Sequence, residues 1–294
     1  MTDGYVEELV YAQSEDGILL DGAVIRPTRA SAGSVSIVWI HGMASRFSAP
    51  TTVHIGREVA RCGYAFVTGN NRGHDFGAMV REASGKSVLR GGGWELFGEA
   101  PRDVAGWIDF AMDRGSRGVV LVGHSLGAMK ATFYLAERSD PRVLALIAAS
   151  PGVKAGRVYR DADVVALAER MVSEGQGADL LPWGISPYHA TTISAASYVS
   201  RLRANIDTFG LDTPDPAIAR VHCPVLAFFG TEERQVGTED DLAVIRRNAK
   251  RARRIDTFMV KGADHDYYGH ETEVARRMTD WLASQGIGPD SPIL

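Results

Sequence analysis

The chain has 294 residues, and its 32 Lys and Arg against 36 Asp and Glu give a formal net charge of −4. Proteins that bind nucleic acid over a broad surface usually carry a basic excess, so the charge balance argues against that class. Hydrophobic residues make up 45% and charged residues 23%, which excludes a mainly disordered chain. Glycine is abundant, at 32 residues without a period, and such glycines are typical of tight turns and close backbone contacts.

In chain order, the first half predicts a hairpin at 5–26, a strand at 35–40, a helix at 53–62, a strand at 64–68, a Gly-rich stretch at 84–98, a helix at 103–113, a strand at 118–122, a helix at 126–138 and a strand at 143–149. The strands after the hairpin are continuous apolar runs, which suit strands buried on both faces. The helices show an apolar stripe at helical spacing. Within the Gly-rich stretch, Gly91–Gly93 is expected to form a mobile loop near the site.

The second half begins with a change of composition. Residues 152–221 contain helical patterns at 161–173 and 193–205 but no obvious buried strand. The alternation then resumes, with a strand at 225–229, a helix at 240–251, a strand at 255–260 and a helix at 271–284. Strands that alternate with helices predict a mainly parallel sheet covered on both faces, the α/β class. We expect one core, made of residues 1–151 and 222–294, with 152–221 inserted as a helical cap.

The N-terminal segment, residues 1–17, has neither the basic nor the apolar region of a signal peptide. No apolar run approaches the roughly 18 residues of a membrane span. The two cysteines, Cys62 and Cys223, have no metal-binding or disulfide spacing, and we expect two buried, reduced thiols. These features predict a cytoplasmic protein without a membrane partner.

The sharpest motif is a G-x-S-x-G sequence, Gly123-His124-Ser125-Leu126-Gly127. It directly follows the predicted strand at 118–122 and opens the helix at 126–138. A nucleophile elbow needs this setting, because a strained turn between strand and helix exposes the serine hydroxyl above the sheet. The Leu126 N–H, at the start of the helix, would face a developing oxyanion. The alternative is a plain tight turn in which Ser125 caps the helix.

A serine nucleophile needs a base. His265 follows the predicted strand at 255–260, and the carboxyl ends of strands are where open α/β sheets place their sites. His41 is expected to bond within its own loop, and His270 to lie at a helix start. We therefore expect His265 to be the general base, and its alternative is a solvated loop histidine.

The acid that orients this base is expected in the loop after the strand at 225–229, where Glu232 and Glu233 are adjacent. We favour Glu233 and keep Glu232 as the alternative acid. A second oxyanion donor is expected in the loop after the first buried parallel strand. There Gly42 permits a tight turn and the Met43 N–H can face the site.

These motifs resemble those of the α/β-hydrolase superfamily over essentially the whole chain. The matching pieces are His41-Gly42-Met43, Gly69–His74, Gly123–Gly127, Gly230–Glu233 and Gly262–His265. The resemblance implies an eight-stranded, mostly parallel sheet, a Ser125–Glu233–His265 triad, and support of the oxyanion loop by Arg72. Two features depart from the family pattern: the acid is Glu where Asp is commoner, and the turn at 70–75 begins Asn-Asn-Arg. Residues 193–198 resemble a branch that includes siderophore esterases.

We expect a serine hydrolase that cleaves a small-molecule carboxylic ester or lactone through an acyl-enzyme. Hydrolysis of a thioester, an amide or a C–C bond would use the same residues, and a non-catalytic ligand-binding protein of this fold is a further alternative. The aromatic residues expected to line the pocket are Trp94, Trp183, Tyr188 and Tyr267. Neither a cofactor nor a metal is expected, and the sequence leaves open whether the chain forms a homodimer.

Overall fold

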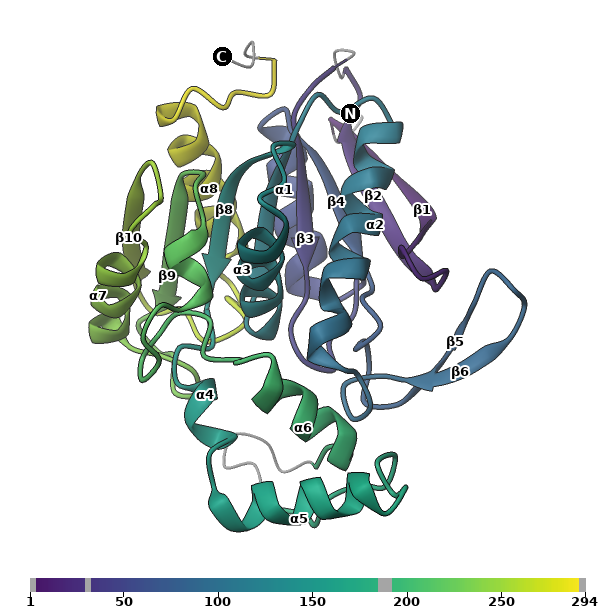
Figure 1. Ribbon diagram of the computed structural model, residues 1–294. Coiled ribbons are helices and arrows are strands. Elements are labelled where there is room, and N and C mark those ends of the chain that lie inside the picture. Colours follow the sequence, from purple (N-terminus) through teal and green to yellow (C-terminus); the bar gives the residue numbers. More distant parts are fainter. Residues whose placement is uncertain (1–3, 30–32, 185–191, 291–294) are drawn as a thin grey trace.

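The computed structural model describes residues 4–29, 33–184 and 192–290, and an eight-stranded sheet lies at its centre (Figure 1). The strand order is β1-β2-β4-β3-β7-β8-β9-β10. The strands are β1 Tyr5–Gln13, β2 Leu19–Pro27, β3 Ser36–Ile40, β4 Ala65–Gly69, β7 Val119–His124, β8 Val143–Ala149, β9 Val225–Gly230 and β10 Ile255–Val260. The β1–β2 and β2–β4 pairs are antiparallel, and all pairs from β4 to β10 are parallel. The predicted eight-stranded, mostly parallel sheet is confirmed.

Helices cover both faces of the sheet. The core helices are α1 Pro50–Arg61, α2 Ala100–Asp113, α3 Leu126–Arg138, α7 Glu239–Asn248 and α8 Glu271–Ser284. β3 shows why both faces are covered: Ile37 and Trp39 join the apolar cluster under α1 and α8, whereas Val38 and Ile40 join the cluster under α2, α3 and α7. Successive side chains of a strand point to opposite faces, so a fully apolar strand needs a helix layer on each side.

The strand order also decides where loops meet. From β3 the chain crosses to β4 on one side, and it later returns to β7 on the other side. The loop after β3 and the loop after β7 therefore diverge, which leaves a crevice at the carboxyl ends of these strands. Open α/β sheets bind their ligands in such a crevice. The residues that meet there are 41–45 and 124–126.

A helical segment lies beyond the edge of the sheet toward which β8 and β9 point (Figure 1). It contains α4 Ala155–Val158, α5 Ala162–Ser173 and α6 Ala195–Arg203. The 3₁₀ turn η2 Ala217–Arg220, which follows in the chain, packs against α3 and α7 of the core. α5 packs on α6, and α5 begins at Asp161, whose carboxylate accepts the backbone N–H groups of Asp163 and Val164. The helices expected at 161–173 and 193–205 are thus α5 and α6.

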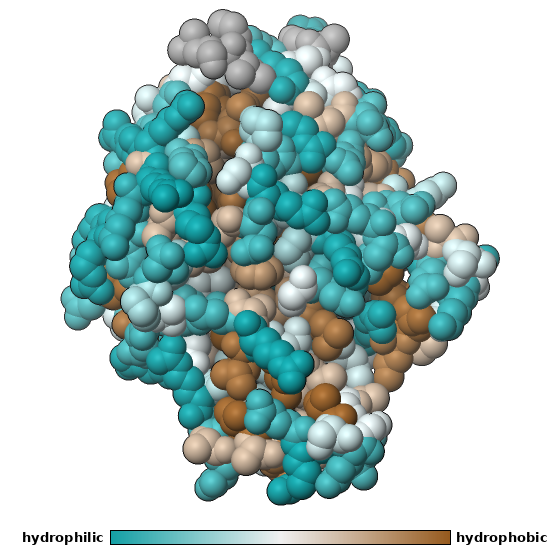
Figure 2. Space-filling view, viewed as in Figure 1, coloured by the Kyte–Doolittle hydropathy of each residue, from teal (hydrophilic) through white to brown (hydrophobic). Residues whose placement is uncertain are grey.

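The hairpin formed by β5 Ala78–Arg81 and β6 Ser87–Arg90 was not predicted. It extends away from the core (Figure 1), and hydrophobic atoms are visible on this side of the molecule in Figure 2. Met79 and Leu89 are exposed on one face of the hairpin, whereas Val80 on the other face is buried and joins the apolar core. Apolar residues therefore occupy both faces, and the alternation of apolar and polar residues that marks a half-buried strand is missing. A single extended hairpin of this kind leaves little periodicity to detect.

Two expectations differ from the structure. Gly91–Gly93 does not form a loose loop, because the three N–H groups donate to the carbonyls of Arg72, Asp75 and Phe76. Cys62 is exposed rather than buried.

Within the described ranges, every helix is too short or too polar to cross a membrane.

Candidate active site

Ser125 occupies a strained turn between β7 and α3. Its φ of 54° and ψ of −122° lie in a region that L residues rarely adopt. The flanking glycines make this turn sterically feasible. A Cβ at Gly123 would lie 2.3 Å from the Gly127 carbonyl oxygen, and a Cβ at Gly127 would lie 2.0 Å from that of Ile40. The turn therefore has the backbone geometry of a nucleophile elbow.

His265 and Glu233 come from the loops after β10 and β9. The Glu233 carboxylate lies 2.5 Å from Nδ1 of His265, and two backbone N–H groups, of Gln235 and Val236, donate to its other oxygen. Burial raises the pKa of Glu233, but the hydrogen bond and charge of His265 outweigh burial, so the pKa is lowered. Burial likewise lowers the pKa of His265, but Glu233 outweighs it and the pKa is raised.

The neighbouring Glu232 does not take part in this pair. Its side chain is exposed and forms a 2.7 Å ion pair with Arg234. Of the two adjacent glutamates, the structure therefore brings only Glu233 to His265.

The backbone of His265 is held by groups from two other loops. His124 Nε2–H donates to the His265 carbonyl over 2.8 Å, and the Ser150 hydroxyl donates to the same oxygen over 3.1 Å. Ser150 also bonds the Tyr267 hydroxyl, 2.7 Å away. Tyr267 is 1% exposed, and its ring packs against those of His124 and Phe228. Sequence reasoning missed Ser150, because no motif distinguishes a serine that bonds one remote carbonyl.

His124 is a neutral group beside the site. Burial, and then the nearby His265, lower its pKa to about 4. Ligand atoms of His124, His265 and Asp266 lie within 4.8 Å of one another, as a metal site would require. However, a carbonyl can only accept, so the His124 Nε2 carries a proton and cannot ligate a metal. Nδ1 of His265 is likewise occupied by Glu233.

The loop after β3 lies directly against Ser125. A Cβ at Gly42 would come within 2.9 Å of the Ser125 Cβ, so only glycine permits this approach. Among the described residues, no acceptor takes the backbone N–H of Met43 or of Leu126. Met43 and Leu126 line the same pocket as Ser125, and they are the two residues that the sequence predicts as oxyanion donors.

His41 fixes this loop in place. Its Nδ1–H donates to the Gly42 carbonyl over 2.8 Å, and its Nε2 accepts the Asn71 backbone N–H over 3.0 Å. The side chain of Asn71 donates back to the His41 carbonyl. Burial, and then the charge of Lys130, lower the pKa of His41 to about 3. A neutral His41 therefore joins the loops after β3 and β4.

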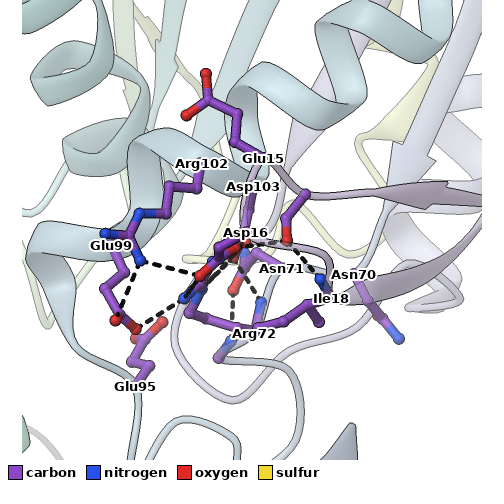
Figure 3. A network of polar contacts seen from close by, with 12 residues as sticks. Glu15, Asp16, Ile18, Asn70, Asn71, Arg72, Glu95, Glu99, Arg102 and Asp103 are labelled. Atoms are coloured by element: carbon purple, nitrogen blue, oxygen red, sulfur yellow. Dashed lines mark hydrogen bonds and ion pairs between the residues drawn. The ribbon is translucent and has the colours of Figure 1, made fainter. Parts of the chain in front are cut away.

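Arg72 has a different role from the one that the resemblance implies. It lies buried in an ionic cluster with three carboxylates, those of Asp16, Glu99 and Asp103 (Figure 3). Its hydrogen bonds go to these groups and not to loop 41–45, which is held by Asn71 instead. Arg72 thus ties the turn after β1 to the start of α2.

A pocket of about 50 Å³ opens beside Ser125. On this measure one water needs about 10–15 Å³, so the pocket suits a group of a few heavy atoms. Its polar lining consists of Ser125, Tyr159 and Arg201. Its apolar lining comes mainly from Met43, Leu126, Met129, Val158, Ile206 and Val236.

Three of the predicted aromatic residues, Trp94, Trp183 and Tyr267, do not line this pocket. The Trp94 indole N–H donates to the Ala178 carbonyl, and its ring packs on Phe76. Trp183 is 70% exposed, and Tyr267 is buried against His124 and Phe228. Tyr188 lies outside the described residues. The pocket is aliphatic because the helical segment supplies Val158 and Ile206, which no local pattern distinguishes from ordinary core residues.

Sequence reasoning also missed three buried charged residues next to the pocket. Glu95 bonds both Lys130 on α3 and Arg201 on α6, and all three are at most 2% exposed by side chain. The one available signal was Lys130, a lone charge in the apolar stretch of the helix at 126–138. Arg201 and Glu95 are 106 residues apart, so only the fold brings them together.

Comparison with known proteins agrees with this geometry. The model of the alpha/beta hydrolase family matches residues 37–277. No curated protein matches the chain. Similar solved structures include Est1E from Butyrivibrio proteoclasticus, which has a TM-score of 0.68 and 16% identity over 94% of this chain and 98% of that chain.

Two further solved structures are similar to this chain, with comparable TM-scores and identities. The Pyrococcus furiosus esterase Pf2001 has a TM-score of 0.61 and 16% identity, over 96% of this chain and 92% of its own. Alpha/beta hydrolase domain-containing protein 10 from mouse has a TM-score of 0.62 and 18% identity, over 95% of this chain and 99% of that chain. At such identities the likeness shows a shared fold.

Proposed function

The chain belongs to the alpha/beta hydrolase family, and we propose that it is a serine hydrolase that cleaves a small-molecule carboxylic ester or lactone. In this proposal the Ser125 hydroxyl attacks the carbonyl carbon. His265 takes the hydroxyl proton and then gives it to the departing alcohol. Water cleaves the resulting acyl-enzyme by the same steps, which restores Ser125 and releases the acid.

The observation that carries the proposal is the buried pair of Glu233 and His265, 2.5 Å apart, beside the strained turn at Ser125. A carboxylate on Nδ1 keeps the proton there, which leaves Nε2 as the basic nitrogen. The same carboxylate stabilises the imidazolium that forms when Ser125 loses its proton. These features support Glu233, rather than Glu232, as the triad acid.

The free N–H groups of Met43 and Leu126 support an oxyanion hole. They would bind the carbonyl oxygen as it becomes negatively charged, and their positions are fixed before the substrate arrives. The loss of one such donor costs on the order of 10²–10³ in kcat in a well-studied serine protease.

The small aliphatic pocket supports a short acyl group rather than a long chain. Residues 152–221 would act as a cap, because α4 and α6 contribute lining residues across from Ser125. A closed pocket excludes bulk water and strengthens the electrostatic interactions within it. An ester or lactone fits this arrangement, and thioesters and amides are the competing substrates.

The test is a fluorophosphonate label followed by turnover of ester, lactone, thioester and amide panels, with Ser125→Ala as the control. We expect wild type to be labelled and to cleave short esters or lactones, and Ser125→Ala to do neither. Turnover confined to thioesters or amides would overturn the substrate class. Absence of both labelling and turnover would favour the non-catalytic ligand-binding alternative.

A further inference from the structure

Arg201 is a buried cation in the wall of the proposed acyl pocket. It projects from α6, is 1% exposed, and lines the same pocket as Ser125. Apart from Ser125 and Tyr159, its neighbours in the lining are apolar or glycine. Burial of a guanidinium among apolar side chains costs free energy unless its charge and N–H groups find partners.

The partners within the protein are incomplete. Nη1 donates to the Tyr159 hydroxyl and lies 3.7 Å from the Met43 Sδ. Nη2 makes two long contacts of 3.3 Å each, to the Gly92 carbonyl and to Glu95. Nε is buried and has no partner among the described residues. A guanidinium has five N–H donors, so part of its donor set remains unused.

The charge is not locally balanced either. Glu95 is the carboxylate that Arg201 contacts among the described residues, and its other oxygen lies 2.5 Å from Nζ of Lys130. Two buried cations therefore share one carboxylate, and the closer contact belongs to Lys130. Two further buried carboxylates lie in this region and both have other partners. Asp103 is held by Arg72, and Asp207, which lines a second pocket with Arg201, accepts three backbone N–H groups and pairs with Arg160.

Resting on the hydrolase function proposed above, we infer that the acyl group of the substrate carries a second carboxylate, which Arg201 and Tyr159 bind. The substrate class is then the half-ester of a short dicarboxylic acid. The acyl side is favoured because the acyl group stays attached to Ser125 while the alcohol leaves, and the small pocket beside Ser125 suits the part that stays. The bound carboxylate supplies the missing charge and acceptor in a site that excludes water.

The first test uses wild type and three ethyl esters. Monoethyl succinate carries the carboxylate, ethyl 4-methylpentanoate has the same shape without charge, and ethyl succinamate is polar but neutral. We expect kcat/KM for monoethyl succinate to exceed both neutral esters by about 10- to 100-fold, as one charged hydrogen-bonded pair allows. Equal or faster cleavage of the neutral esters would overturn the inference.

The second test separates recognition from structural support. Arg201→Met should lower kcat/KM for monoethyl succinate by about 100-fold and leave ethyl 4-methylpentanoate within about threefold. Arg201→Lys should recover part of the loss, since it keeps the charge but not the planar donor set. Arg203→Met is the matched control, because Arg203 lies exposed on the same helix. An equal loss for both esters in Arg201→Met would show a structural role only and overturn the inference.

A third measurement does not depend on turnover. In the Ser125→Ala background, calorimetry should detect binding of succinate but not of 4-methylpentanoate, and Arg201→Met should abolish it. Succinate binding without turnover of any ester would support the carboxylate site and refute the hydrolase proposal. Turnover of neutral esters without succinate binding would refute the carboxylate site alone.

Discussion

The Glu233 carboxylate lies 2.5 Å from Nδ1 of His265, and the two side chains are 1% and 16% exposed. The pair joins loops that are 32 residues apart in the chain. Because it is shielded from water, each member strongly shifts the protonation of the other. The pair therefore leads to predictions that mutation of Glu233 and measurements at different pH values can test.

Glu233→Gln should lower kcat by about 10²–10⁴-fold, since a neutral amide neither stabilises the imidazolium nor fixes the tautomer of His265. Glu232→Gln makes the same chemical change on an exposed neighbour and should stay within about threefold of wild type. Steady-state kinetics on a short ester distinguish them. A larger loss in Glu232→Gln would assign the acid to that residue.

The pH dependence of kcat/KM should rise through an apparent pKa above the ordinary 6.5 of histidine. The sign follows from the mechanism: a base works in its neutral form, and Glu233 favours the protonated form, so activity appears only at higher pH. In Glu233→Gln burial still disfavours protonation, and the rise should move to lower pH. An unchanged midpoint in that variant would contradict the coupling.

Gly42→Ala should lower kcat by at least tenfold with a smaller change in KM, because a Cβ 2.9 Å from that of Ser125 displaces the loop that carries the Met43 N–H. Gly98→Ala is the matched control, since a Cβ there meets nothing within 4 Å. A fluorophosphonate labelling rate that is normal in Gly42→Ala would argue against this loop as the oxyanion donor.

Stability should fall as pH is lowered from about 6.5 toward 4.5. The pKa of His41 is lowered to about 3 and that of His124 to about 4, so in this window the unfolded chain binds protons that the folded chain does not. The free energy of unfolding then changes by up to about 1.4 kcal/mol per pH unit for each histidine. Urea unfolding at several pH values measures the slope.

His41→Asn should make the free energy of unfolding depend less steeply on pH. The substitution also weakens the hydrogen bonds by which His41 joins the loops after β3 and β4. His222→Asn, at an exposed histidine, is the matched control for the loss of one imidazole. If His222→Asn flattens the slope as much as His41→Asn, the buried histidine is not its source.

Glu95→Gln should destabilise the fold by about 3–5 kcal/mol, because Lys130 and Arg201 would both lose their shared buried carboxylate. Glu58→Gln, in the exposed pair with Arg61, should cost at most about 1 kcal/mol. Denaturant unfolding of the two variants gives the comparison. Similar losses in the free energy of unfolding would mean that burial does not increase the contribution of the Glu95 cluster to stability.

The sequence predicted the parallel sheet because a strand buried on both faces must be apolar throughout, as at 118–122, and the pattern is local. It also predicted the turn at Ser125, since the G-x-S-x-G motif is local. Gly123 is required by contacts with Gly127 and Ala128 close along the chain, whereas Gly127 is required by the remote Ile40 carbonyl. The β5–β6 hairpin escaped prediction because apolar residues lie on both of its faces, Met79 and Leu89 on the exposed face and Val80 on the buried face, so its sequence does not alternate.

The choice of Glu233 over Glu232 was also made from sequence, but only the tertiary structure gives it a physical basis. In the structure one glutamate turns inward to His265 and the other turns outward to Arg234. Tertiary structure alone packed Tyr267 against His124 and Phe228 and turned Arg72 toward Asp16, Glu99 and Asp103. It also set Arg201 beside Ser125. Local periodicity records which side chains are buried, whereas the partner that a buried charge meets is decided by chain crossings many residues away.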